Sequence, residues 1–147
     1  MECEGVRATD LADRFGTPLY VYSGGTLRDH YRKIATAFGD LSPTICYSIK
    51  SCGNLGVLRV LAQAGAGMDA VSGGEVERAW LAGVPLSRVA FAGVGKTEPE
   101  IRAALDGRHS LLAGSAHAEK AAGRGPVGCF NVESEQEFER IAGLARQ

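Results

Sequence analysis

The stretch Thr44-Ile45-Cys46-Tyr47-Ser48-Ile49-Lys50 decides how the rest of the sequence is interpreted. Larger apolar residues alternate with small ones, so Ile45, Tyr47 and Ile49 would share one face of a strand. A helical pattern starts at Leu55, and the stretch therefore predicts a strand, a short loop and a helix in succession. Lys50 then stands at the carboxyl end of a strand, where α/β proteins place their catalytic and binding residues.

The local pattern leaves two interpretations of Lys50 open. Most lysines in such a position are solvated charges that end a strand and do nothing more. The alternative is an amine in a partly dry pocket, which loses its proton easily and forms a Schiff base with a carbonyl compound. Only the rest of the sequence can decide between the two.

The composition is that of an ordinary globular protein, with 45% hydrophobic and 22% charged residues in 147. A net charge of -1 gives no reason to expect a nucleic acid or an anionic membrane surface as partner. No apolar run has the length of a membrane span, and the first residues do not resemble a signal peptide, so we expect a cytoplasmic protein. The cysteines and histidines lack the spacing of metal ligands, and no metal site is predicted.

Strand and helix patterns alternate along residues 44–147 with a period of roughly 20 to 25 residues. We expect strands at about 44–50, 68–71, 88–92 and 127–132. Helices should follow them, capped by Asn54 and by the capping boxes that begin at Thr97 and Ser134. Residues 1–43 form an amino-terminal segment with two expected helices, capped by Thr9 and Thr26. Residues 106–126 interrupt the alternation and are expected to be a surface insertion with a little helix around 116–122.

Two architectures contain consecutive units of this kind. An open doubly wound sheet could be complete at this length, whereas a (β/α)8 barrel needs about 250 residues, so that this chain would supply its amino-terminal half. None of the glycine-rich loops has the G-x-G-x-x-G spacing of a nucleotide-binding sheet. The stretch Gly93-Val94-Gly95-Lys96-Thr97 invites comparison with a phosphate-binding P-loop but lacks the upstream glycine that a P-loop requires.

Six ordered segments, which leave out the expected insertion, resemble the amino-terminal part of the diaminopimelate decarboxylases. These are fold-type III decarboxylases that depend on pyridoxal 5'-phosphate and have an alanine-racemase-like barrel. The resemblance implies the amino-terminal half of a (β/α)8 TIM barrel, with residues 44–147 as its first four βα units and with the remaining barrel and the β-domain absent. The segments are 15–22, 46–52, 54–58, 67–75 (Gly-Met-Asp-Ala-Val-Ser-Gly-Gly-Glu), 93–97 and 130–135 (Phe-Asn-Val-Glu-Ser-Glu).

By this resemblance, Lys50 is the catalytic lysine that bonds to the cofactor, and Asp69 is the cofactor-binding aspartate beneath it. The relatives most often follow this lysine with Ala-Asn, where this chain has Ser51-Cys52, which leaves the detail of the first loop open. From the residues alone, Asp69 is better explained as a carboxylate in a turn or at the approach to a helix. Glu75 is expected to be a first-turn residue favoured by the helix dipole. Asn131 and Glu133 are expected to line the wall of the site.

The function that the resemblance implies is decarboxylation of meso-2,6-diaminopimelate to L-lysine, the last step of lysine biosynthesis, by a homodimer that uses pyridoxal phosphate. As an amino-terminal part, the chain is expected to be inactive or nearly so by itself. Three alternatives stay open. They are a related decarboxylase of ornithine, arginine or carboxynorspermidine, a non-catalytic barrel protein that binds pyridoxal phosphate, and a small α/β binding domain without a cofactor.

Overall fold

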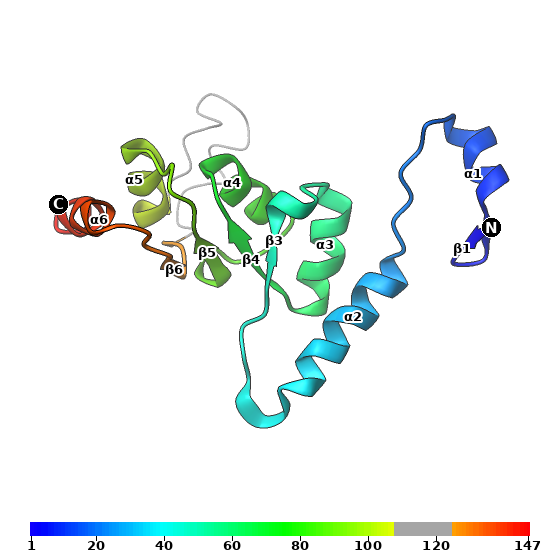
Figure 1. Ribbon diagram of the computed structural model, residues 1–147, viewed down its shortest axis with the longest axis horizontal. Coiled ribbons are helices and arrows are strands. Elements are labelled where there is room, and N and C mark those ends of the chain that lie inside the picture. The colour runs from blue at the N-terminus through cyan, green and yellow to red at the C-terminus, as the bar shows by residue number, and fades with distance from the viewer. Residues whose placement is uncertain (108–124) are drawn as a thin grey trace.

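The computed structural model describes residues 1–107 and 125–147. Its body is a parallel sheet of four strands in the order β3-β4-β5-β6 (Figure 1). The strands are β3 (Cys46–Ser48), β4 (Gly67–Ala70), β5 (Val89–Phe91) and β6 (Cys129–Phe130). Each strand is followed by one helix. These helices are α3 (Leu55–Ala64), α4 (Gly73–Leu81), α5 (Glu98–Asp106) and α6 (Glu135–Ala145).

The strand order distinguishes the two architectures that the sequence left open. In a doubly wound sheet the order reverses at a switch point and helices cover both faces. Here each strand pairs with the next one along the chain, and each helix contacts the next helix, from α2 to α6. Strands and helices therefore advance together around one side, as in the first half of a (β/α)8 barrel. The barrel prediction agrees with the structure.

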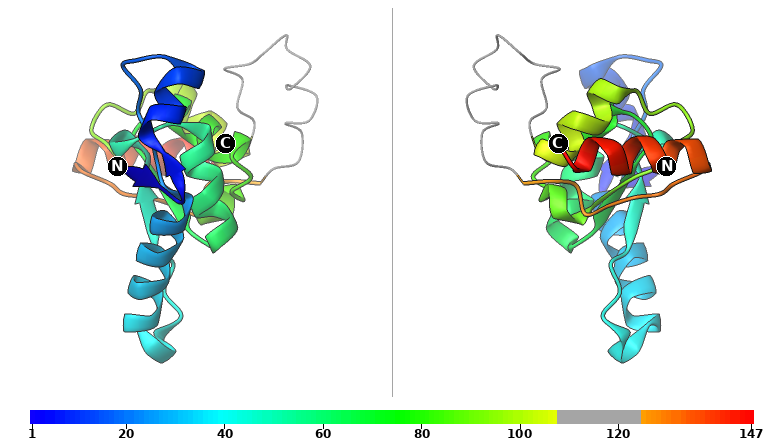
Figure 2. Two further views of the ribbon diagram at one scale, coloured as in Figure 1. Left: turned by 90° about the vertical axis from the view of Figure 1, so that its right-hand side faces the viewer. Right: turned by 90° about the vertical axis from the view of Figure 1, so that its left-hand side faces the viewer.

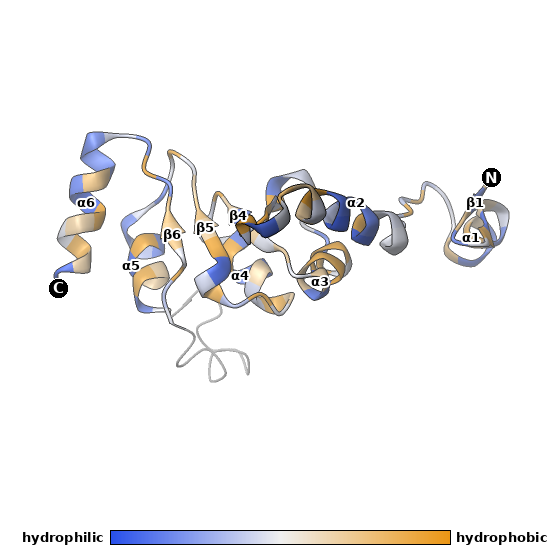
Figure 3. Cartoon of the chain, turned by 90° about the horizontal axis from the view of Figure 1, so that it is seen from below, coloured by the Kyte–Doolittle hydropathy of each residue, from blue (hydrophilic) through white to orange (hydrophobic). Residues whose placement is uncertain are grey.

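The hydrophobic core lies between the sheet and these helices. Met68, Ala70, Val89 and Phe91 alternate along β4 and β5 and are at most 1% exposed. Figure 3 shows β5 and β6 in mainly hydrophobic colours. Burying these side chains on one face fixes the register, because a slip of one residue would turn all of them toward solvent. The helices contribute Val57, Leu58, Leu61, Val76, Ala79 and Ala104.

The opposite face of the sheet, which we call the helix-free face, carries small or polar side chains. A hollow of about 280 Å³ opens on this face, with Cys46 and Cys129 in its lining. Gly67 must be a glycine here, since a Cβ would meet the Arg88 main-chain oxygen at 2.5 Å. In a closed barrel this face would be the interior. Its strand residues are Cys46, Ser48, Gly67, Asp69, Ala90 and Cys129.

The amino-terminal segment departs most from expectation. It begins with an unpredicted hairpin of β1 (Glu2–Cys3) and β2 (Val6–Arg7), followed by α1 (Ala8–Phe15) and the long α2 (Gly24–Ala37). Thr9 lies inside α1 and does not cap it. The cap of α2 is Ser23, whose Oγ accepts a hydrogen bond from the Thr26 main-chain N–H at 3.0 Å. Both cap predictions are wrong. Figure 2 shows α2 extending beyond the sheet.

The capping prediction at α3 is confirmed and can be tested. Asn54 Oδ1 accepts hydrogen bonds from the main-chain N–H groups of Gly56 at 2.8 Å and Val57 at 3.4 Å. We expect Asn54→Ala to lower the free energy of unfolding by about 1 kcal/mol, measured by urea unfolding. Asn54→Ser keeps an acceptor and serves as the control. Equal stabilities of the alanine and serine variants would contradict the prediction.

The predicted insertion at 106–126 has ends that meet. Gly107 ends α5 with a left-handed φ of 65°, and a Cβ at this position would collide with the main chain of Gly125. The expected helix around 116–122 lies outside the described residues. Among the described residues, no helix is both long enough and apolar enough to cross a membrane.

Candidate active site

Lys50 lies in a single 3-10 turn, η2 (Ile49–Ser51), directly after β3. The strand therefore ends at Ser48, two residues earlier than the alternation predicted. Ile49 is 1% exposed and anchors the turn in the core, whereas Lys50 beside it is exposed. The lysine amine is thus accessible at the carboxyl end of β3.

The lysines of the described chain differ in their partners. Lys33 Nζ pairs with Asp29 Oδ2 at 2.7 Å, and Lys96 Nζ pairs with Glu137 Oε1 at 2.9 Å. Within residues 1–107 and 125–147, Lys50 has neither a carboxylate partner nor a side-chain hydrogen bond. A lysine whose ammonium is engaged by a carboxylate is less available to a ligand than one whose side chain has no partner. Among the described residues, Lys50 is therefore the lysine whose amine is both exposed and without a partner.

Asp69 lies on β4, the neighbour of β3, as the register partner of Ser48. Ser48 Oγ donates a hydrogen bond to Asp69 Oδ2 at 3.0 Å, which orients the half-buried carboxylate on the helix-free face. Asp69 sits within a strand, so its alternative explanation as a turn or helix-approach carboxylate is wrong. The structure places Lys50 and Asp69 at the carboxyl ends of adjacent strands.

The loop after Lys50 carries Cys52, a thiol with a lowered pKa. The Asn54 main-chain N–H and the Tyr22 hydroxyl lower the pKa of Cys52, and the same contact with Cys52 raises the pKa of Tyr22. Arg78 Nη1 donates to the Gly53 carbonyl at 2.9 Å and ties this loop to α4. The first loop, whose detail the departure at Ser51-Cys52 left open, is therefore joined to the amino-terminal segment and to α4.

Glutamates near the helix starts connect the next two loops. Glu75 Oε2 accepts a hydrogen bond from the Val71 main-chain N–H at 2.8 Å, which confirms its expected place in the first turn of α4. Glu100 Oε1 accepts from the Gly73 N–H at 2.7 Å, and its Oε2 accepts from the Thr97 N–H at 2.9 Å. Glu100 therefore links the loop before α4 to the start of α5.

The loops after β5 and β6 are joined more tightly. Glu133 Oε1 accepts a hydrogen bond from the Gly93 main-chain N–H at 2.8 Å, so this expected wall residue holds a neighbouring loop. The Lys96 side chain is 0% exposed and ion-paired with Glu137. A lysine held in this way cannot bind a phosphate, so the P-loop comparison is wrong. No local sequence pattern indicated this buried pair.

The buried pair predicts a loss of stability in acid. Burial raises the pKa of Glu137. The Glu133 N–H, Lys96 and Arg140 together lower it by more than burial raises it, so the pKa lies below the ordinary 4.5. A carboxyl with a lowered folded-state pKa contributes stability above its unfolded pKa and loses it as the pH falls through the folded pKa. We expect the free energy of unfolding to decrease below about pH 4.5. Urea unfolding across this range should show a weaker dependence in Glu137→Gln, and parallel curves would contradict the prediction.

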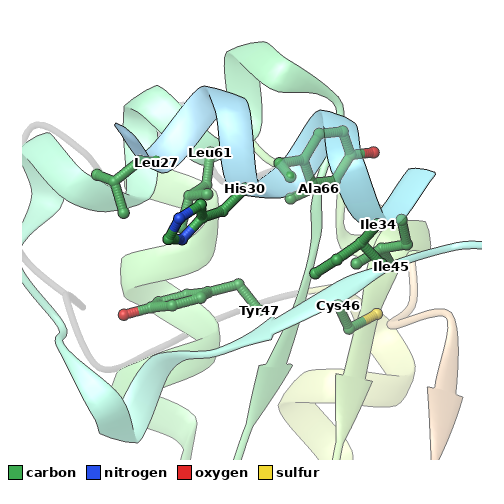
Figure 4. Close-up of a pocket in the computed structure, with 9 residues that line it drawn as sticks. Leu27, His30, Ile34, Ile45, Cys46, Tyr47, Leu61 and Ala66 are labelled. Atoms are coloured by element: carbon green, nitrogen blue, oxygen red, sulfur yellow. The ribbon is translucent and has the colours of Figure 1, made fainter. Parts of the chain in front are cut away.

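A pocket of about 250 Å³ between α2 and β3 lies apart from these residues. Figure 4 shows His30 of α2 and Tyr47 of β3 on opposite sides of it. Its lining includes neither Lys50 nor Asp69, and apart from His30 it is largely apolar. The reactive groups and this pocket are therefore separate features.

Known proteins resemble this chain over nearly its whole length. Residues 24–147 match the family model for the pyridoxal-dependent decarboxylase, pyridoxal binding domain. The chain is 44% identical over 142 residues to diaminopimelate decarboxylase of Vibrio cholerae, covering 97% of this chain and 30% of the relative.

The structure of AQ1208 from Aquifex aeolicus superimposes with a TM-score of 0.79 at 39% identity, covering 97% of this chain and 30% of that one. Diaminopimelate decarboxylase from Helicobacter pylori, solved with L-lysine, gives 0.76 at 31% identity, covering 95% and 31%. The chain thus spans about 30% of these relatives.

Proposed function

Because this chain belongs to the pyridoxal-binding domain family of the pyridoxal-dependent decarboxylases, we propose that it supplies the lysine-bearing part of an enzyme that decarboxylates meso-2,6-diaminopimelate to L-lysine. Pyridoxal phosphate is the cofactor of this family. The observation that carries the proposal is Lys50, an exposed and unpaired amine at the end of β3 among the described residues. Asp69 on the adjacent strand completes the proposed site.

The residues present fit an aldehyde cofactor. Lys50 offers an exposed primary amine that no carboxylate of the described residues engages, and the small side chains around Asp69 on the helix-free face leave space beside it. When bound, pyridoxal phosphate supplies the electron sink for the electron pair that remains after carbon dioxide leaves. Lys50 would hold the cofactor through its side-chain amine, and when not bonded to it Nζ could carry a proton. Asp69, oriented by Ser48 Oγ, provides negative charge and a hydrogen-bond acceptor.

The proposal extends to the protein as a whole. Its substrate is a small amino acid, its active form is a homodimer, and it works in the cytoplasm, all of which the family resemblance supports. The chain alone is inactive or nearly so, because it spans about 30% of the relatives whose activity it would share. Steady lysine production by the isolated chain would contradict this point.

A chimera tests the proposal. In it, this chain replaces the matching 30% of the Vibrio cholerae relative. We expect the chimera, loaded with pyridoxal phosphate, to form lysine and carbon dioxide from meso-2,6-diaminopimelate, with much slower turnover of ornithine, arginine and carboxynorspermidine. Preferred turnover of one of those three would favour the related decarboxylases. A folded, loaded chimera without turnover of any of them would favour a non-catalytic barrel.

A further inference from the structure

The buried ammonium of Lys96 has every donor occupied. Its Nζ contacts Glu137 Oε1 at 2.9 Å, the Gly93 carbonyl oxygen at 2.5 Å and the Asn131 carbonyl oxygen at 3.1 Å. A lysine ammonium has three N–H donors, so these three oxygens use all of them. The ammonium also lies 5.7 Å from the centre of the Phe91 ring, within range of a cation–π contact.

These contacts close into a network between two loops. Glu137 Oε2 accepts a hydrogen bond from the Glu133 main-chain N–H at 2.8 Å, and Glu133 in turn accepts from Gly93. Gly93 is thus held through both its N–H and its carbonyl. We call Gly93, Lys96, Asn131, Glu133 and Glu137 the Lys96 network. It joins the loop after β5 to the loop after β6 at the carboxyl ends of the strands.

The network leaves one functional group free. The Asn131 main chain is fixed on both sides, because its N–H donates to the Phe91 carbonyl at 3.0 Å and its carbonyl accepts from Lys96. Its side chain is exposed, and in the described part of the chain its amide makes no hydrogen bond. A binding residue needs surrounding contacts that hold it in place, and the main-chain bonds of Asn131 provide such support.

Stability alone does not explain a buried ion pair here. Replacing such a pair by uncharged groups of similar volume is often neutral or stabilising, because two charges must be desolvated to form it. What an apolar pair could not supply is three hydrogen bonds that fix two loops at once. We propose, on the basis of the function proposed above, that Lys96 is a positioning residue that sets Asn131 to bind the amino-acid substrate at the mouth of the barrel.

The test uses the loaded chimera and the double variant Lys96→Met/Glu137→Gln. Both charges disappear together, so no unpaired charge is left buried, and the new amide oxygen at position 137 can still accept from the Glu133 N–H. The matched control is Glu98→Gln/Arg102→Met, which removes an exposed ion pair of 2.9 Å from α5 and leaves the loops untouched. Hydrogen exchange at the Gly93 and Glu133 amides reports the network directly, and KM against kcat reports substrate binding.

We expect exchange at both amides to become at least about tenfold faster and KM for meso-2,6-diaminopimelate to rise about tenfold or more, with a smaller change in kcat. The control should leave all of these values unchanged. Asn131→Ala should raise KM alone, and combining it with the double variant should raise KM no further. Equal KM values in the double variant and the control would overturn the proposal.

Two further readouts keep the outcomes distinct. If the double variant does not fold, Asn131→Ala alone decides, and an unchanged KM overturns the role assigned to Lys96. Borohydride trapping of pyridoxal phosphate at Lys50 should be the same in the parent chimera and in every variant. If the parent chimera fails to trap the cofactor there, the proposed function itself is wrong and the positioning role falls with it.

Discussion

The Lys50→Ala chimera forms no measurable lysine. We expect its kcat for meso-2,6-diaminopimelate to fall at least about 1,000-fold, which corresponds to about 4 kcal/mol of transition-state stabilisation. The physical reason is that no other lysine of the described chain offers an exposed amine without a carboxylate partner. Steady-state kinetics measure the loss, and borohydride reduction followed by peptide mapping shows where the cofactor is bound.

Lys33→Ala is the matched control. Lys33 is also exposed, but its ammonium pairs with Asp29 on α2, so its removal should leave kcat within about twofold of the parent. Peptide mapping should find the trapped cofactor on Lys50 in this variant and in the parent. Full activity of Lys50→Ala, or trapping of the cofactor mainly on Lys33, would contradict the assignment.

Phe91→Ala lowers the free energy of unfolding by about 3–5 kcal/mol. The Phe91 ring is 0% exposed, and its centre lies 5.8 Å from that of Phe130 in a tilted pair. Its loss opens a cavity in the core and removes the ring beneath the Lys96 ammonium. Urea unfolding of the chain measures the change.

Phe138→Ala provides the comparison for the core substitution. Phe138 lies on α6 and is 61% exposed, so truncating it should change the unfolding free energy by less than about 0.5 kcal/mol. Similar losses in the two variants would show that the sheet and helices do not pack as described. A small loss in Phe91→Ala alone would show that the site collapses around the missing ring.

Alternation along 44–50 predicted that Ile45, Tyr47 and Ile49 share one face. The period of two is a local property of extended chain, and Ile49 is indeed buried in the core, with Tyr47 packed against it. Helix caps were predictable where the side chain bonds within its own turn, as at Asn54. At α2 both Ser23 and Thr26 are capping residue types, and Ser23 is the cap. Its hydroxyl also donates to Glu4 from a distant part of the chain, a contact that a local pattern does not contain.

The residues of the site were also predictable only in part. The resemblance assigned Lys50 and Asp69, and strand pairing brings them to adjacent strand ends. The Lys96 network escaped prediction because its members come from two loops that meet only after β5 and β6 pair. Lys96 also stands in a glycine-rich stretch, where the sequence directed attention to phosphate binding. The hairpin of β1 and β2 was missed because strands of two residues show no periodicity.

The helix-free face has a consequence for how this protein can evolve. Apart from Gly67, where a Cβ would strike the main chain, its strand residues alternate with the buried core residues, so under the proposed function variation at Ser48 or Ala90 should affect turnover more than stability. At neighbouring positions such as Met68 and Val89 the effect is the opposite, because substitution of these buried side chains lowers the stability of the fold before it affects turnover. A saturation library scored separately for abundance and for turnover should therefore show two interleaved sets of intolerant positions along each strand, offset by a single residue.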